Sequence, residues 1–218
     1  MNIPMNDLND LTAFCDPAAG KKPNQVKKVR ARSAIVVVGQ DDFQRIFVLK
    51  AWGQRCRTDE LVEEIMKTSE TWSPKVFGIE ANAMQSLFAD CVQRESKMRG
   101  LVLPIRPILQ PTKVDKIYRI RSALQPVISE GRLFIQEDQH ELKQEILTFP
   151  MSPTVDIIDA LASAVALLPK RNKNFSQIES QDSYEQYLRD THAPEWYIAR
   201  ERQKTFAWNK NSRELLGS

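Results

Sequence analysis

The sequence lacks most of the residues on which nucleophilic enzymes and sulfur-based metal sites depend. It contains 2 histidines, His140 and His192, and neither accompanies a recognisable nucleophile motif, so a Ser-His-Asp or Cys-His set is not expected. The 3 cysteines are widely spaced and form no CxxC pair, which argues against a disulfide framework and against a zinc site. A metal site in this chain would therefore have to be built from carboxylates.

Targeting and membrane segments are also missing. The longest helical apolar stretch, 157–168, contains Asp159 and is shorter than the roughly 20 residues that a membrane helix needs. The N-terminal residues do not combine a basic segment with an apolar core, so we expect no signal peptide, a cytosolic protein and no membrane partner. The 218 residues include 31 basic and 28 acidic ones, and this near balance makes the distribution of charge more informative than its sum.

The order of predicted elements indicates a mixed α/β fold. Three strand-like runs joined by short links predict an antiparallel meander, and strands then alternate with helices. We expect strands at 11–15, 33–39, 45–52, 75–79 and 101–105, with 131–135 as a short strand or extended segment. We expect an irregular loop enforced by Pro104, Pro107 and Pro111, and helices from an N-cap at Thr58 to before Pro74 and at 82–98, 113–125, 140–147 and 156–168. Together these predict a mixed five-stranded sheet with helices on both faces.

The domain organisation follows from a change in composition. After Pro169 the sequence becomes polar and is punctuated by isolated aromatic residues. We therefore divide the chain into a lead-in at 1–10, one domain at 11–169 and a C-terminal extension at 170–218.

Four carboxylates stand at the ends of predicted elements. Asp16 follows the first strand, Glu80 ends the fourth, and Asp156 and Asp159 open the last helix on one face. If the first and fourth strands are neighbours, about 4.8 Å apart, their terminal acids face one another and the helix can supply a third. Clustered carboxylates take up protons unless a cation lies between them, and Mg²⁺ or Mn²⁺ prefers such oxygen ligands. The alternative is structural: a turn, a solvated strand end or a helix start, although Asp159 within an apolar run needs a partner.

Basic residues gather in two segments. The segment 20–32 contains no acid, and its basic residues are Lys21, Lys22, Lys27, Lys28, Arg30 and Arg32. A second set lies in and before the helix expected at 113–125 and consists of Arg99, Arg106, Lys113, Lys116, Arg119 and Arg121. Two basic segments beside a carboxylate site suit a duplex phosphate backbone, and a solvated loop with a solvated helix face is the alternative.

Taken together, these motifs resemble the nuclease domain of the large terminase subunit of tailed bacteriophages, in the ribonuclease H-like superfamily. The resemblance covers roughly residues 11–168, and a His-Asp pair of the family is replaced here by Thr154-Val155. The matching motifs are Asp16-Pro17-Ala18, Glu80-Ala81-Asn82-Ala83, Asp156-Ile157-Ile158-Asp159-Ala160-Leu161, Lys113, Lys116-Ile117, Leu124-Gln125-Pro126, Gly131-Arg132-Leu133-Phe134 and Phe149-Pro150.

The resemblance implies a ribonuclease H-like endonuclease that cuts concatemeric viral double-stranded DNA during genome packaging, by two-metal phosphodiester hydrolysis. It implies two Mg²⁺ or Mn²⁺ ions, held by the catalytic residues Asp16, Glu80, Asp156 and Asp159. It also implies a location in the host cell cytoplasm and, as partners, the terminase ATPase domain, the small terminase subunit and the portal. The expected DNA contacts are Lys21, Lys22, Lys27, Lys28, Arg30, Arg32, Lys113, Lys116 and Arg119.

Two alternatives differ from this hypothesis in substrate or in class. One is a junction resolvase or transposase-like nuclease of the same fold. The other is a non-catalytic module whose aromatic residues between 184 and 208 dock on the packaging motor or portal. The sequence contains no GxxxxGK[ST] motif, so we expect no ATPase motor in this chain.

The basic segment gives a first testable prediction. A variant in which Lys27, Lys28 and Arg30 are neutralised should bind duplex DNA less tightly than the wild type. The dependence of affinity on salt should also become shallower, by about 0.9 in the log–log slope for each phosphate that the variant no longer neutralises. The measurement is fluorescence anisotropy of a labelled duplex over a salt series, and an unchanged slope would exclude this role.

Overall fold

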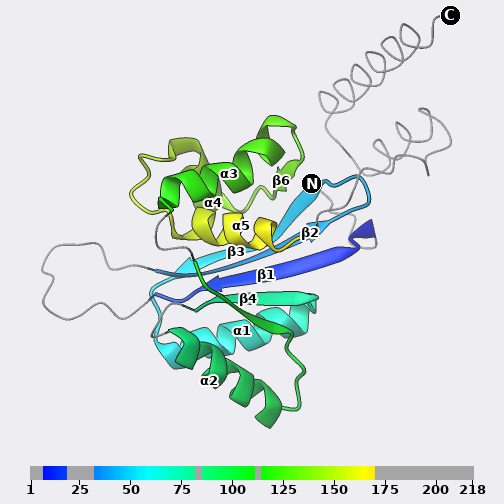
Figure 1. The fold of residues 1–218 in the computed structure, drawn as a ribbon, viewed down its shortest axis with the longest axis vertical. Coiled ribbons are helices and arrows are strands. Elements are labelled where there is room, and N and C mark those ends of the chain that lie inside the picture. Colours follow the sequence, from blue (N-terminus) through cyan, green and yellow to red (C-terminus); the bar gives the residue numbers. More distant parts are fainter. Residues whose placement is uncertain (1–6, 19–31, 82–84, 111–113, 170–218) are drawn as a thin grey trace, which may run out of the picture. The chain divides into compact units, whose positions relative to one another are not determined.

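A mixed sheet forms the centre of the protein in a computed structural model that describes residues 7–18, 32–81, 85–110 and 114–169. The sheet has 6 strands in the order β5-β4-β1-β2-β3-β6 (Figure 1). The strands are β1 Asp10–Asp16, β2 Ser33–Gln40, β3 Ile46–Gln54, β4 Val76–Glu80, β5 Ile105–Ile108 and β6 Leu133–Ile135. The helices are α1 Thr58–Trp72, α2 Gln85–Met98, α3 Lys116–Ser129, α4 His140–Thr148 and α5 Asp156–Ala166. The predicted mixed α/β class is confirmed.

The pairing of the strands explains where their ends meet. β1, β2 and β3 form the predicted antiparallel meander, in which Asp16 at the end of β1 lies opposite Ala34 at the start of β2. β4 runs parallel to β1 on its other side, with Cys15 paired to Ile79, so both strands finish at the same edge of the sheet. Every residue of β2 is buried, as expected for a central strand covered on both faces.

Helix α5 packs across the middle of the sheet, and this packing fixes the position of its N-terminus. In Figure 1, α3, α4 and α5 cover one face of the sheet while α1 and α2 cover the other. The Thr12 hydroxyl on β1 donates a buried hydrogen bond of 3.0 Å to the carbonyl of Ala164 on α5. A Cβ at Gly53 on β3 would lie 2.7 Å from Ile157, so glycine is needed for the start of α5 to pack this closely. Small residues thus let the helix that carries two of the predicted acids approach the sheet.

Some element limits differ from the sequence predictions. A sixth strand, β6, pairs in parallel with β3. The strand expected at 101–105 lies at Ile105–Ile108, because Pro107 is tolerated in an edge strand whose outer side needs no ladder donor. The helix expected to end before Pro126 continues through it to Ser129, and Asp115 is its N-cap. Thr58 is the first residue of α1, not its cap, and the cap position is Arg57.

Part of the predicted organisation lies outside the described residues. This holds for residues 1–6 of the lead-in, for the segment 19–31, for Lys113 and for the extension 170–218. The domain limits drawn from the sequence therefore stay a prediction. Across the part of the chain that the structure describes, none of the helices is both long and apolar enough to cross a membrane.

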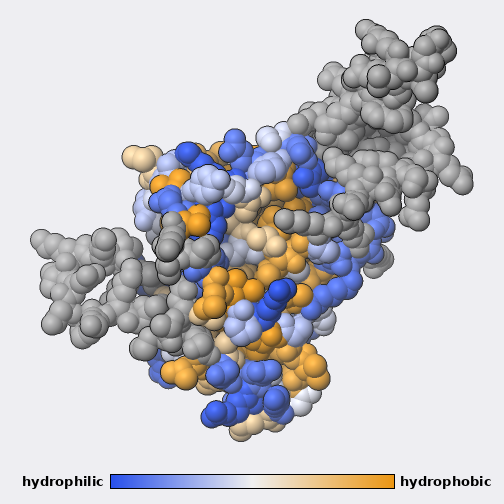
Figure 2. All heavy atoms as spheres, in the orientation of Figure 1, coloured by the Kyte–Doolittle hydropathy of each residue, from blue (hydrophilic) through white to orange (hydrophobic). Residues whose placement is uncertain are grey.

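Hydrophobic residues remain on the surface and are mixed with hydrophilic ones on the face shown in Figure 2. The most exposed large ones include Val102 before β5, Leu147 on α4 and Met151 in the following turn. These residues belong to separate segments. Scattered surface hydrophobics of this kind are normal for a folded protein and do not by themselves define a docking face.

A buried ion pair closes the turn between β2 and β3. Asp41 and Arg45 are almost fully buried, with 2.6 Å between Asp41 Oδ2 and Arg45 Nε. The amides of Phe43 and Arg45 donate to the second carboxylate oxygen, and the guanidinium lies 5.7 Å and 5.5 Å from the ring centres of Phe43 and Phe47. Burial raises the pKa of Asp41, and the Arg45 charge and hydrogen bonds oppose that rise.

We expect the Asp41–Arg45 pair to be important for the free energy of unfolding. Arg45→Met should lower the free energy of unfolding by about 3–5 kcal/mol, because it leaves a buried carboxylate without its counter-charge. Urea unfolding followed by circular dichroism measures the change. Arg57→Ala is the control, since Arg57 pairs with Asp59 on the surface and its loss should leave the midpoint nearly unchanged. Equal midpoint shifts in the two variants would contradict the prediction.

Candidate metal centre

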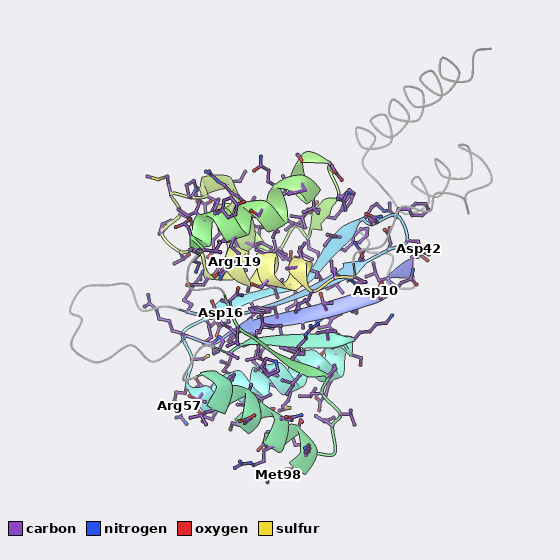
Figure 3. All side chains as sticks on the ribbon, viewed as in Figure 1. Asp10, Asp16, Asp42, Arg57, Met98 and Arg119 are labelled. Atoms are coloured by element: carbon purple, nitrogen blue, oxygen red, sulfur yellow. The ribbon has the colours of Figure 1, made fainter. Side chains whose placement is uncertain are left out.

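Asp16 and Glu80 meet at the edge of the sheet where β1 and β4 end. Their neighbours Cys15 and Ile79 are paired in the parallel ladder, so the two acids are the next residues along adjacent strands. Figure 3 shows Asp16 at one end of β1 and Asp10 at the other. The negative charge of Glu80 contributes to the raised pKa of Asp16, so the two carboxyl groups lie close enough to interact. The facing of these two acids, expected from the strand order, is therefore present.

The surroundings of Asp16 disfavour its charge. Burial raises the pKa of Asp16 well above its ordinary range, and the negative charges of Glu80 and Asp159 raise it further. The Lys116 ammonium acts in the opposite direction but is outweighed. An acid whose charge is suppressed by burial and by other acids is a typical component of a functional site.

Asp159 is held by two cations from α3. Its side chain is 5% exposed, with Lys116 Nζ 3.0 Å from Oδ2 and Arg119 Nη2 2.5 Å from Oδ1. Burial alone would lower the pKa of Lys116, but the charge and hydrogen bond of Asp159, with the charges of Asp16 and Asp156, raise it instead. Lys116 therefore interacts electrostatically with three of the four predicted acids.

Arg119 is itself fixed to the helix that carries Asp159. Its Nη1 donates to Gln110 Oε1 at 2.9 Å, and the Gln110 amide donates to the Ser163 hydroxyl at 3.0 Å. Gln110 follows β5 and Ser163 lies one turn beyond Asp159 on α5. The Arg119 guanidinium is thus held to α5 twice, directly by Asp159 and through Gln110 by Ser163.

Asp156 has a different cationic neighbour. Its Oδ2 accepts a hydrogen bond from the backbone amide of Arg32 at 3.3 Å and lies 3.9 Å from Arg32 Nε. The Arg32 guanidinium also bonds Glu141 and Glu145 on α4. Arg32 was predicted as a DNA contact, and in the structure its side chain is directed into the protein.

The structure thus brings together the four predicted acids and two of the predicted cations, Lys116 and Arg119. The other predicted cations, Lys21, Lys22, Lys27, Lys28, Arg30 and Lys113, lie outside the described residues. Sequence reasoning missed Gln110, Ser163 and Glu145. A signal existed for Glu145, because it shares a helix face with Leu142 and Ile146, where a charged residue is unexpected.

Comparison with known proteins agrees with this geometry at the level of the fold. No protein-family model matches the sequence, and no curated protein sequence matches it. Among solved structures, the large terminase nuclease domain of phage P22 is similar with a TM-score of 0.50 and 12% sequence identity, covering 74% of this chain and 81% of that one. The chain has the ribonuclease H-like fold.

Two further solved structures of this fold class have lower scores. The large terminase nuclease of the thermophilic phage G20c with bound zinc gives a TM-score of 0.48 at 16% identity, covering 66% of this chain and 78% of that chain. The RuvC protein of T. thermophilus in complex with a Holliday junction substrate gives 0.41 at 11% identity, covering 71% and 90%.

The carboxylate oxygens at the shared end of β1 and β4 suit a hard divalent cation chemically. Burial and the charge of Glu80 disfavour the ionised form of Asp16, which a cation would favour, and both acids offer only oxygen ligands. In the present arrangement of the described residues, no three Asp, Glu, His or Cys side chains lie close enough together to hold a metal ion. Asp159 instead directs its oxygens to Lys116 and Arg119. It would have to exchange these partners to become a third ligand.

The raised pKa of Asp16 predicts how stability depends on pH without metal. Folded Asp16 keeps its proton above the unfolded pKa of about 3.9, so ionisation increasingly favours the unfolded state as the pH rises towards the folded pKa. Asp16→Asn cannot ionise. In EDTA, its melting temperature should therefore rise relative to the wild type as the pH increases above about 4.

Thermal melts over this pH range provide the measurement. Asp42→Asn is the control, because Asp42 lies at the opposite end of the sheet (Figure 3). Its difference from the wild type should not grow with pH in the same way. A constant difference between Asp16→Asn and the wild type would show that Asp16 ionises normally.

Proposed function

We propose that this protein is a metal-dependent DNA endonuclease that cuts concatemeric viral double-stranded DNA during genome packaging. The observation that carries the proposal is the convergence of Asp16, Glu80 and Asp159 from two parallel strand ends and a helix, beside Lys116 and Arg119. The ribonuclease H-like fold supports the proposal, as does the order of the acidic motifs along the chain.

In this proposal two Mg²⁺ or Mn²⁺ ions would be held by the four acids Asp16, Glu80, Asp159 and Asp156. Bound between a scissile phosphate and a water molecule, such ions would supply an activated nucleophile and neutralise the charge of the leaving oxygen. The acidic motifs include no histidine, so their carboxylates are the groups that can accept a proton there. A proton held by Asp16 would leave when a metal ion binds there.

Lys116 and Arg119 have a second role in the proposal. Their positive charges neutralise Asp159 in the present arrangement. Phosphate oxygens of DNA would accept hydrogen bonds from the same ammonium and guanidinium groups. Each carboxylate–cation bond at the site would then be replaced by carboxylate–metal and cation–phosphate contacts. The terminase ATPase domain, small subunit and portal remain the proposed partners.

The proposal predicts nuclease activity that depends on these acids. Wild-type protein should nick and linearise supercoiled plasmid with Mn²⁺ or Mg²⁺ and should be inactive in EDTA. Asp16→Asn, Glu80→Gln and Asp159→Asn, which keep side-chain size, should each lower the rate at least about 100-fold, the scale of removing a preorganised charge interaction. Asp42→Asn at the far end of the sheet should cut at the wild-type rate.

The substrate separates the proposal from its alternatives. A packaging nuclease should cut linear duplex, whereas a preference for four-way junctions over duplex of the same sequence would favour a resolvase. Cleavage that survives EDTA or all three substitutions would exclude the metal mechanism. Absence of cleavage by folded, metal-loaded protein on every substrate would favour the docking module.

A further inference from the structure

A buried carboxylate that the proposed chemistry does not use lies beneath the start of α5. Glu145 belongs to α4 and is 2% exposed. Its Oε2 accepts a hydrogen bond of 2.8 Å from the backbone amide of Ile158 in the first turn of α5. The N-cap residue of α5, Val155, has no side chain able to accept such a bond. Glu145 therefore supplies from another helix the cap that α5 lacks.

The second oxygen of Glu145 is satisfied by two donors. Arg32 Nη2 lies 2.8 Å from Oε1, and the Thr154 hydroxyl donates to the same oxygen at 2.9 Å. Arg32 Nη2 also donates to Thr154 Oγ1 at 3.1 Å, while Nη1 reaches Glu141 at 2.6 Å. A charge this deeply buried is stable only with a counter-charge and complete hydrogen bonding, and Arg32 and Thr154 provide both.

Arg32 connects this network to the candidate metal centre. It immediately precedes β2, whose residue Ala34 lies opposite Asp16 in the antiparallel ladder. Its backbone amide donates to Asp156, the first residue of α5. The start of β2 and the first turn of α5 are thereby held together by one residue, next to the strand end that carries Asp16.

We propose that Glu145 and Arg32 are positioning residues that fix the first turn of α5 so that Asp156 and Asp159 face Asp16 and Glu80. This inference rests on the proposed metal-dependent function. Asp156 and Asp159 both lie in that first turn, three residues apart on one face. Without the cap from Glu145 the Ile158 amide loses its acceptor, and the first turn of α5 frays or rotates. The carboxylates then lose their alignment although neither is changed.

A role limited to stability would give a different result, so the test compares two buried ion pairs. Glu145→Ala removes the cap of α5, whereas Arg45→Met breaks the Asp41–Arg45 pair in the turn at the opposite end of the sheet. Both variants should be less stable than the wild type. Only the first should affect the metal centre.

Manganese binding to the full chain without DNA is measured by electron paramagnetic resonance, in which the signal of free Mn²⁺ reports the unbound ion. Binding is measured at a temperature where circular dichroism shows every variant to be folded. Glu145→Ala should raise the dissociation constant for Mn²⁺ about 10- to 100-fold, the range observed for groups that orient metal ligands. Arg45→Met should leave it within about 2-fold of the wild type, since changes at distant sites act independently.

Two milder variants cover the case in which Glu145→Ala does not fold. Glu145→Gln keeps an oxygen that can accept from the Ile158 amide but loses the charge that pairs with Arg32. Arg32→Lys keeps the charge but cannot bond Glu141, Glu145 and Thr154 together. Both should raise the dissociation constant less than Glu145→Ala does. In plasmid cleavage, Glu145→Gln should raise the Mn²⁺ concentration for half-maximal rate while its rate at saturation stays close to that of the wild type.

The outcomes separate the two proposals. Manganese affinities that are unchanged in the Glu145 and Arg32 variants, or that fall equally in Arg45→Met, would overturn the positioning role while leaving the metal centre intact. Wild-type protein that binds no Mn²⁺ and cuts no DNA would overturn the proposed function itself, and the positioning role with it.

Discussion

The mutual repulsion of four carboxylates at one edge of the sheet is the constraint on which the rest of the site depends. Burial and the negative charges of Glu80 and Asp159 raise the pKa of Asp16, so the neutral form of this acid is favoured and the repulsion is reduced. Asp159 relieves it through Lys116 and Arg119, and Asp156 through Arg32. In the metal-free protein, ionisation of Asp16 is thus disfavoured, and Asp159 and Asp156 lie beside cations. A divalent cation would replace these partners with a single, stronger counter-charge.

The fold produces this crowding because three elements end or begin at the same edge. Parallel pairing of β1 with β4 brings Asp16 beside Glu80, and the close packing of α5 on the sheet adds the other two acids. The cations come from α3 and from the residue before β2. Positive and negative groups therefore arrive at the edge together, and the buried Glu145 holds the first turn of α5 between them.

Sequence reasoning succeeded where local pattern determines structure. The antiparallel meander, the acids at strand ends and the shared face of Asp156 and Asp159 follow from strand length, turn residues and helical spacing. It failed where distant contacts decide. Pro126 does not end its helix, because tertiary packing buries the neighbouring Leu124 and Val127. Likewise, nothing near Arg32 in the chain shows that its partners lie more than a hundred residues away on α4.

Whether these carboxylates bind metal ions can be seen in a crystal structure of the protein with Mn²⁺, analysed by anomalous scattering at the manganese absorption edge. Anomalous peaks should lie between Asp16 and Glu80 at the shared end of β1 and β4. In the same crystals, Asp159 should have turned from Lys116 and Arg119 towards the ions. A map from Mn²⁺-saturated crystals with no peak at these carboxylates, or with peaks only elsewhere, would contradict the proposed metal centre.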